Sequence, residues 1–156
     1  SLDTTRVWVD CWALEQYASA MPVASPEDAT AMTKELLELY RGDFLGGDRE
    51  ETWILPARER LKAIMLQAIG KVAKLCTSSG NLDRAIALYS KGIEIDSLAE
   101  SLYRELMLCY ESVGRPAEGI AVYRRLEKTL SILLSTKPTR ESRVVFDRLL
   151  ARRSCQ

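Results

Sequence analysis

Few residues in this 156-residue chain could do chemistry, because it contains no histidine. Histidine is the commonest general base near neutral pH and the commonest neutral metal ligand. The four cysteines, Cys11, Cys76, Cys109 and Cys155, include no Cys-x-x-Cys pair, so they lack the spacing of a zinc or dithiol redox site. We predict that Cys76 and Cys109 are small buried hydrophobic residues. Unpaired thiols also suit an intracellular, reducing compartment.

One segment, "GDFLGGDREE", gathers glycines and acidic side chains. Its carboxylates could suggest a cation site, but their spacing does not match a calcium-binding loop. It has neither the lysine nor the spacing of a phosphate-binding P-loop. The sequence also shows no nucleophile paired with a base. We therefore predict no catalytic residue, no metal site and no cofactor. The acidic residues of this segment are Asp43, Asp48, Glu50 and Glu51.

Charge is distributed unevenly although the net charge is zero. Residues 1–52 hold 4 basic and 11 acidic residues, whereas 115–156 hold 10 basic and 4 acidic ones. A basic face on the last predicted helix could contact nucleic-acid phosphates. Because Glu141 and Asp147 interrupt it, a solvated face or docking on a partner's acidic surface is favoured. The residues of this predicted basic face are Arg140, Arg143, Arg148 and Arg152.

Helices must position these residues, since helical periodicity dominates the chain. "TRVWV" (5–9) alternates and suggests a short strand or connector, whereas Ser25 followed by Pro26 and two acids predicts a helix start. Ser97 and Thr139 are predicted N-caps of later helices. Two early helices are followed by five more, over about 53–79, 82–95, 98–113, 116–133 and 139–153. Such a pattern predicts an all-α bundle or solenoid of seven helices.

Two similar decapeptides, "GNLDRAIALY" and "GRPAEGIAVY", begin 34 residues apart, which is the tetratricopeptide period. The turn between the helices of a hairpin needs a residue that accepts positive φ, here Gly80 and Gly114. A small residue, Ala85 in the first copy, allows the two helices to cross closely, and Gly119 matches it in the second. An aromatic one turn later fills the wedge beneath the crossing, at Tyr89 and Tyr123. We therefore predict repeats at about 66–97 and 98–131.

The first helices of such hairpins line a concave groove that suits a protein partner. Its predicted lining mixes charge and hydrogen-bonding groups, as at protein interfaces. The partner-groove candidates are Gln67, Lys74, Thr77, Arg104, Leu108 and Glu111. A small-molecule pocket is an alternative, because several aromatic residues fall outside the repeats: Trp8, Trp12, Tyr40 and Trp53.

Nearly the whole chain resembles the bacterial transcriptional activator domain, the tetratricopeptide-like module of Streptomyces antibiotic regulatory protein type activators. "VWVDCWALEQYASA" resembles the family's opening, and "LYRGDFLGGDREETWILPARERL" its most recognisable block. "ESLYRELMLCYESVGRPAEGIAVYRRLEKTL" resembles the repeat core, where Gly119 departs from the usual alanine. The matching positions in the recognisable block are Tyr40, Gly42, Phe44, Leu45, Trp53, Arg58, Arg60 and Leu61.

The resemblance implies tetratricopeptide-like antiparallel hairpins in one right-handed superhelical domain over 11–156. Residues 1–10 would be the connector from an upstream winged-helix DNA-binding domain, which also fits a chain that lacks an initiator Met. It implies a cytoplasmic, non-enzymatic module that positions that domain, forms a homodimer or contacts the transcription machinery. DNA would be reached only through the upstream domain. The alternatives are a domain that senses a small molecule or nucleotide and direct DNA contact through the basic last helix.

We expect Tyr89→Ala and Tyr123→Ala each to lower the free energy of unfolding by about 3–5 kcal/mol, because each removes a wedge aromatic from the core. Thermal melts of the two variants measure this. Melts that match the unsubstituted chain would show that the repeat assignment is wrong.

Overall fold

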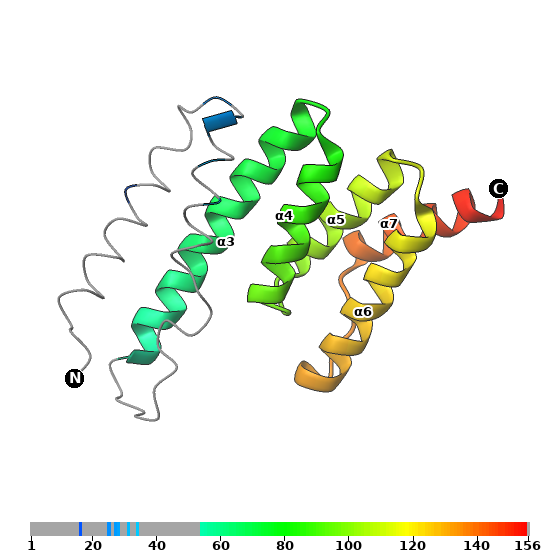
Figure 1. The fold of residues 1–156 in the computed structure, drawn as a ribbon. Coiled ribbons are helices and arrows are strands. Elements are labelled where there is room, and N and C mark those ends of the chain that lie inside the picture. Colours follow the sequence, from blue (N-terminus) through cyan, green and yellow to red (C-terminus); the bar gives the residue numbers. More distant parts are fainter. Residues whose placement is uncertain are drawn as a thin grey trace. The chain divides into compact units, whose positions relative to one another are not determined.

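The computed structural model describes residues 54–155 and six earlier positions: Gln16, Ser25, Glu27, Asp28, Ala31 and Lys34. Within these residues the chain is helical and contains no strand. It divides into two compact units, Ser1–Val72 and Ala73–Gln156, which we describe separately. The helices are α3 (Ile54–Ser78), α4 (Leu82–Ile95), α5 (Glu100–Ser112), α6 (Pro116–Leu134) and α7 (Arg140–Ser154) (Figure 1).

The first unit confirms the helix start predicted at Ser25. The backbone N–H of Asp28 donates to the Ser25 hydroxyl (3.2 Å), which itself donates to the Asp28 carboxylate (2.7 Å). The first of these bonds satisfies one of the backbone N–H groups that the helix N-terminus leaves open. The part of α3 in this unit buries a stripe that recurs every three or four residues, as in an amphipathic helix: Leu61, Met65, Ala68, Ile69 and Val72.

The second unit contains the two glycine turns predicted from the sequence. Gly80 has φ +80° and Gly114 has φ +72°, and no atom lies within 4 Å of where a Cβ would stand on either. The amide after each glycine bonds back into the preceding helix: Asn81 to the Cys76 carbonyl (2.8 Å), and Arg115 to the Tyr110 carbonyl (2.9 Å). The same helix-ending motif thus recurs at both turns, and backbone conformation alone selects glycine there.

The start of α5 differs from the prediction. Its N-cap is Ala99, not Ser97. Asp96 instead accepts the local hydrogen bonds. Its side chain accepts the N–H of Leu98 (3.0 Å), and its carbonyl accepts the N–H of Ala99 (3.2 Å). The Ser97 carbonyl accepts the Tyr103 hydroxyl (3.1 Å). Two extra residues therefore form the turn before the helix begins.

α7 packs against both helices of the α5–α6 hairpin (Figure 1). A buried cluster joins the three helices, with Leu108, Val122 and Phe146 packed at its edge. Tyr123 stacks on Phe146, with ring centroids 4.1 Å apart and an interplanar angle of 15°. Tyr89 is 1% exposed and Tyr123 5%, which confirms that both tyrosines are core residues. The cluster consists of Met107, Ile120, Tyr123, Val145 and Leu149.

The small residue at Gly119 has a different neighbour from the one expected. The sequence suggested a crossing of the two helices within a hairpin. In the structure a Cβ on Gly119 would stand 2.8 Å from Cδ1 and 3.1 Å from Cδ2 of Leu149. Leu149 belongs to α7 and is fully buried. The lack of a side chain at Gly119 therefore lets α7 pack closely against the α5–α6 hairpin.

Most of the two earliest predicted helices, the strand or connector predicted at 5–9, and the aromatic and acidic candidates before residue 54 lie outside the described residues. So does Cys11. The count of seven helices and the superhelical path accordingly stay predictions.

We expect Gly119→Ala to lower the free energy of unfolding by about 1 kcal/mol, because crowding against Leu149 costs ~1–3 kcal/mol and exceeds the gain of ~1 kcal/mol in helix propensity. Gly70→Ala is the control, since no atom lies within 4 Å of its Cβ position. It should raise the free energy of unfolding by about 0.5–1 kcal/mol. Denaturant titrations of each variant, alone and combined with Leu149→Ala, measure the coupling. Equal gains from both glycine substitutions would contradict the close approach.

Candidate functional site

The predicted partner-groove residues lie on α3 and α5. On α3, Gln67 lies in the first unit, whereas Lys74 and Thr77 lie in the second; all three are exposed. The Thr77 hydroxyl donates to the Ala73 carbonyl (2.9 Å) and lies 3.9 Å from the Cys109 sulfur. This hydroxyl is thus engaged within the fold.

The predicted basic face lies on α7, where all four arginines are exposed. Two of them turn toward α5. Arg148 Nη2 donates to one carboxylate oxygen of Glu111 (2.8 Å), and Arg152 Nε lies 3.2 Å from the other. Arg140 and Arg143 have no ion pair among those found in the described part of the chain. The basic face therefore divides into Arg148 and Arg152, which pair with Glu111 of α5, and Arg140 and Arg143, which do not contact Glu111.

The structure brings half of the groove candidates against α7, and one of them, Glu111, against half of the basic face. Besides the Glu111 contacts, Arg104 on α5 donates to Glu141 on α7 (2.7 Å). Leu108 packs at the edge of the cluster that holds Val145 and Leu149. We call the polar contacts between these helices the α5–α7 seam: Glu100, Arg104 and Glu111 from α5 with Thr139, Glu141, Ser142, Arg148 and Arg152 from the α7 side.

Glu100 is the seam residue that the sequence did not reveal. Its Oε1 accepts the Thr139 N–H, the Thr139 hydroxyl and the Ser142 hydroxyl, each at 2.7 Å. Thr139 is the N-cap of α7 as predicted, but its side chain makes no bond to its own helix backbone. Glu100 supplies the carboxylate at this helix terminus from 39 residues away. No local pattern indicates such a partner.

The hydrogen bonds to Glu100 decide its ionisation. Burial raises the pKa of this carboxyl, but the bonds from Ser142 and Thr139 favour the ionised form and outweigh burial. Its pKa therefore lies below the ordinary value of 4.5. The ionised carboxylate is the form that holds the start of α7.

The cysteines follow the prediction where they are described. Cys76 and Cys109 are buried, and Cys155 is exposed. Burial raises the pKa of the Cys109 thiol, which disfavours the reactive thiolate. Cys76 and Cys109 thus act as apolar core residues.

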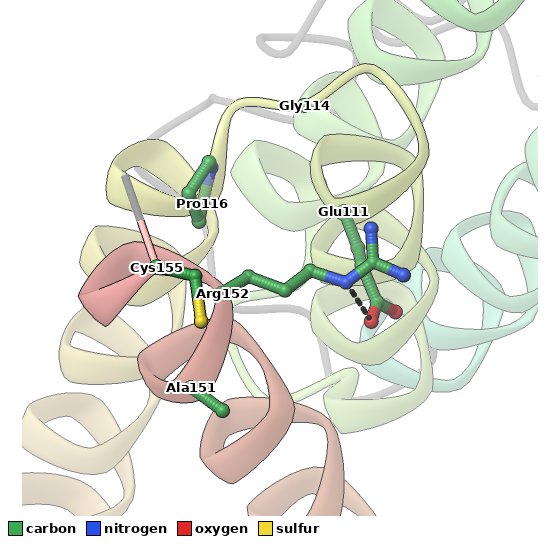
Figure 2. Close-up of a pocket in the computed structure, with 6 residues that line it drawn as sticks. All are labelled: Glu111, Gly114, Pro116, Ala151, Arg152 and Cys155. Carbon is green, nitrogen blue, oxygen red and sulfur yellow. Dashed lines mark ion pairs between the residues drawn. The ribbon is translucent and has the colours of Figure 1, made fainter.

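A cleft opens beside one end of the seam, between the α5–α6 turn and the last turns of α7 (Figure 2). Its volume is about 360 Å³. The walls are mostly apolar, with the Glu111–Arg152 ion pair at one edge. The lining residues are Glu111, Gly114, Pro116, Ala151, Arg152 and Cys155.

Within the described residues no group of three or more Cys, Asp or Glu side chains could hold a metal ion. None of the described helices is long and apolar enough to cross a membrane. What the described arrangement does offer is charged and apolar surface for recognition, on α7 and around the cleft.

The seam predicts an acid-sensitive contribution to stability. Since Glu100 has a lower pKa in the folded chain than in the unfolded chain, its contribution is present above about pH 4.5 and is lost as the pH falls through the folded value. We expect Glu100→Gln to cost about 1 kcal/mol at pH 7 and progressively less below pH 4.5. Urea titrations between pH 3 and 7 measure this. Glu94→Gln, which removes an exposed pair with Lys91, is the control and should change stability by less than about 0.5 kcal/mol. A constant deficit for Glu100→Gln across this range would contradict the assignment.

Comparison with known proteins identifies the family. The model of the bacterial transcriptional activator domain matches residues 9–150. Two curated relatives, each named transcriptional regulatory protein MoaR1, come from Mycobacterium bovis (strain BCG / Pasteur 1173P2) and Mycobacterium tuberculosis (strain ATCC 25618 / H37Rv). Each is 26% identical over 114 residues, which cover 73% of this chain and 37% of the relative. No solved structure matches. With nearly its whole length matched by the family model, this chain belongs to the bacterial transcriptional activator domain family.

Proposed function

We propose that this chain is a tetratricopeptide-like, non-catalytic regulatory module of a cytoplasmic bacterial transcription regulator. Its role is to bind protein partners: an attached DNA-binding domain, a second copy or the transcription machinery. The observation that carries the proposal is the family match over 9–150. The relatives are named as transcriptional regulatory proteins, and the chain spans about a third of their length.

The helical turns support the tetratricopeptide-like part of the proposal. Gly80 and Gly114 end α3 and α5 with the same positive-φ motif, at the period expected of such repeats. α7 packs on α5 and α6 as the first helix of a further hairpin would. Stacked hairpins of this kind present extended surfaces to protein partners.

The contacts of the α5–α7 seam reduce the part of the predicted groove that a partner could bind. Arg104 and Glu111 pair with α7, and Leu108 packs beside it, so this half of the groove candidates already has a partner within the chain. Lys74 stays exposed, as do Arg140 and Arg143 on α7. Direct DNA contact through α7 is the weaker candidate, because Glu111 engages two of the four arginines of the predicted basic face.

A transcription reporter tests the proposal. We expect this chain, fused to a heterologous DNA-binding domain at a weak promoter, to change reporter output relative to that domain alone. The isolated chain should not shift DNA at physiological salt, because Glu111 pairs with two arginines of the basic face and the net charge of the chain is zero. Unchanged reporter output would refute the regulatory module. A gel shift of sub-micromolar affinity by the isolated chain would favour direct DNA contact instead.

A further inference from the structure

The cleft between the α5–α6 turn and the end of α7 combines two properties that the seam does not explain. One edge carries surplus positive charge, and the walls are small and apolar. A site of this kind suits a ligand with an acidic group next to an apolar one.

The positive charge arises because one carboxylate faces two guanidinium groups. The Glu111 side chain is 11% exposed, whereas Arg148 is 51% exposed and Arg152 61%. Arg152 approaches Glu111 through Nε, and Figure 2 shows one of its terminal nitrogens turned away from the carboxylate. A guanidinium carries five N–H donors, so those that Glu111 does not use can bind a second carboxylate.

The neighbouring charges keep this balance positive. Arg115, at the α5–α6 turn, pairs with Glu118 (2.8 Å) and lies over the Tyr110 ring. It is therefore neutralised by its own partner. Arg153 follows Arg152 and adds a further exposed positive charge to the last turn of α7.

The apolar part has room for a side chain. Gly114, Ala151 and Cys155 are small, and Pro116 is fixed at the first turn of α6. A volume of about 360 Å³ accommodates a leucine- or methionine-sized group. Nucleic-acid phosphates would use the arginines and leave these walls uncovered.

We propose that this cleft binds a short acidic peptide segment of a partner protein. An apolar side chain of the peptide lies among Gly114, Pro116 and Ala151, and a neighbouring carboxylate pairs with Arg152 and Arg148. The proposal rests on the regulatory function above and names the chemistry of one partner. It places recognition at the turn end of the α5–α6 hairpin rather than along α5.

Selection from a displayed library of short random peptides tests the proposal, with the purified chain as bait and its Ala151→Glu variant for counter-selection. We expect enrichment of peptides that join a large apolar residue to Asp or Glu. Fluorescence anisotropy of a labelled enriched peptide then measures affinity. Ala151→Glu should weaken binding about tenfold or more, because it fills the cleft and introduces like charge. Arg152→Gln should weaken it about three- to fivefold.

Two substitutions outside the cleft serve as matched controls for Ala151→Glu and Arg152→Gln. Ala121→Glu places the same charge on an exposed alanine of α6, and Arg143→Gln removes another exposed arginine of α7; neither residue lines the cleft. Both should leave the affinity within about twofold. Melting temperatures check that every variant is folded.

Several outcomes would overturn the cleft assignment. These are no cleft-dependent enrichment, enrichment of basic peptides, equal binding to Ala151→Glu, and competition by duplex DNA as strong as that by the unlabelled peptide. Reporter output that persists in the fusion despite such a result would leave the regulatory function standing. Loss of both would count against the function itself.

Discussion

The close approach of Leu149 to Gly119 sets the position of α7 on the rest of the second unit. A Cβ on Gly119 would stand 2.8 Å from a methyl of Leu149, so any larger residue would hold the two helices apart. Once Leu149 is seated there, Phe146 lies one turn earlier against Tyr123, at a centroid distance of 4.1 Å. The buried cluster follows from this one contact. Interiors packed at this density deform little, so α7 has a single well-defined seat.

The α5–α7 seam contributes more to the position of α7 than to the free energy of unfolding. Arg148, Arg152 and Glu141 are each more than half exposed, and ion pairs of this kind contribute about 0–1 kcal/mol each. Their value lies in position: Glu100 binds the start of α7, whereas Glu111 binds its end. A helix shifted by one turn would lose both sets of contacts together. The apolar cluster holds α7 on the hairpin, and the two carboxylates select its register.

Local rules in the sequence predicted the helices and turns but not the partners between them. The bounds of α4 agree with the prediction, and the other described helices agree within about two residues. The positive φ of Gly80 and Gly114 and the burial of Tyr89 and Tyr123 were also predicted, because each follows from periodicity or turn chemistry. Glu100 was not predicted, since its three hydrogen bonds reach residues far along the chain. Ser97 failed as a cap because the N–H groups of Ala99 and Glu100 bond to the backbone carbonyls of Asp96 and Leu98.

Because local patterns do not predict which helix faces meet, two surfaces that the sequence assigned to different roles contact each other in the fold. A helical wheel indicates that Glu111 and Arg148 each lie on a polar face, but not that the faces oppose one another. Pairing them removes the inner part of both faces from the available surface, and at the margin two arginines share one carboxylate. That margin adjoins the cleft lined by Pro116 and Ala151. The contacts that seat α7 thus also create the place where surplus charge and apolar surface lie together, so recognition at this end depends on α7 being docked.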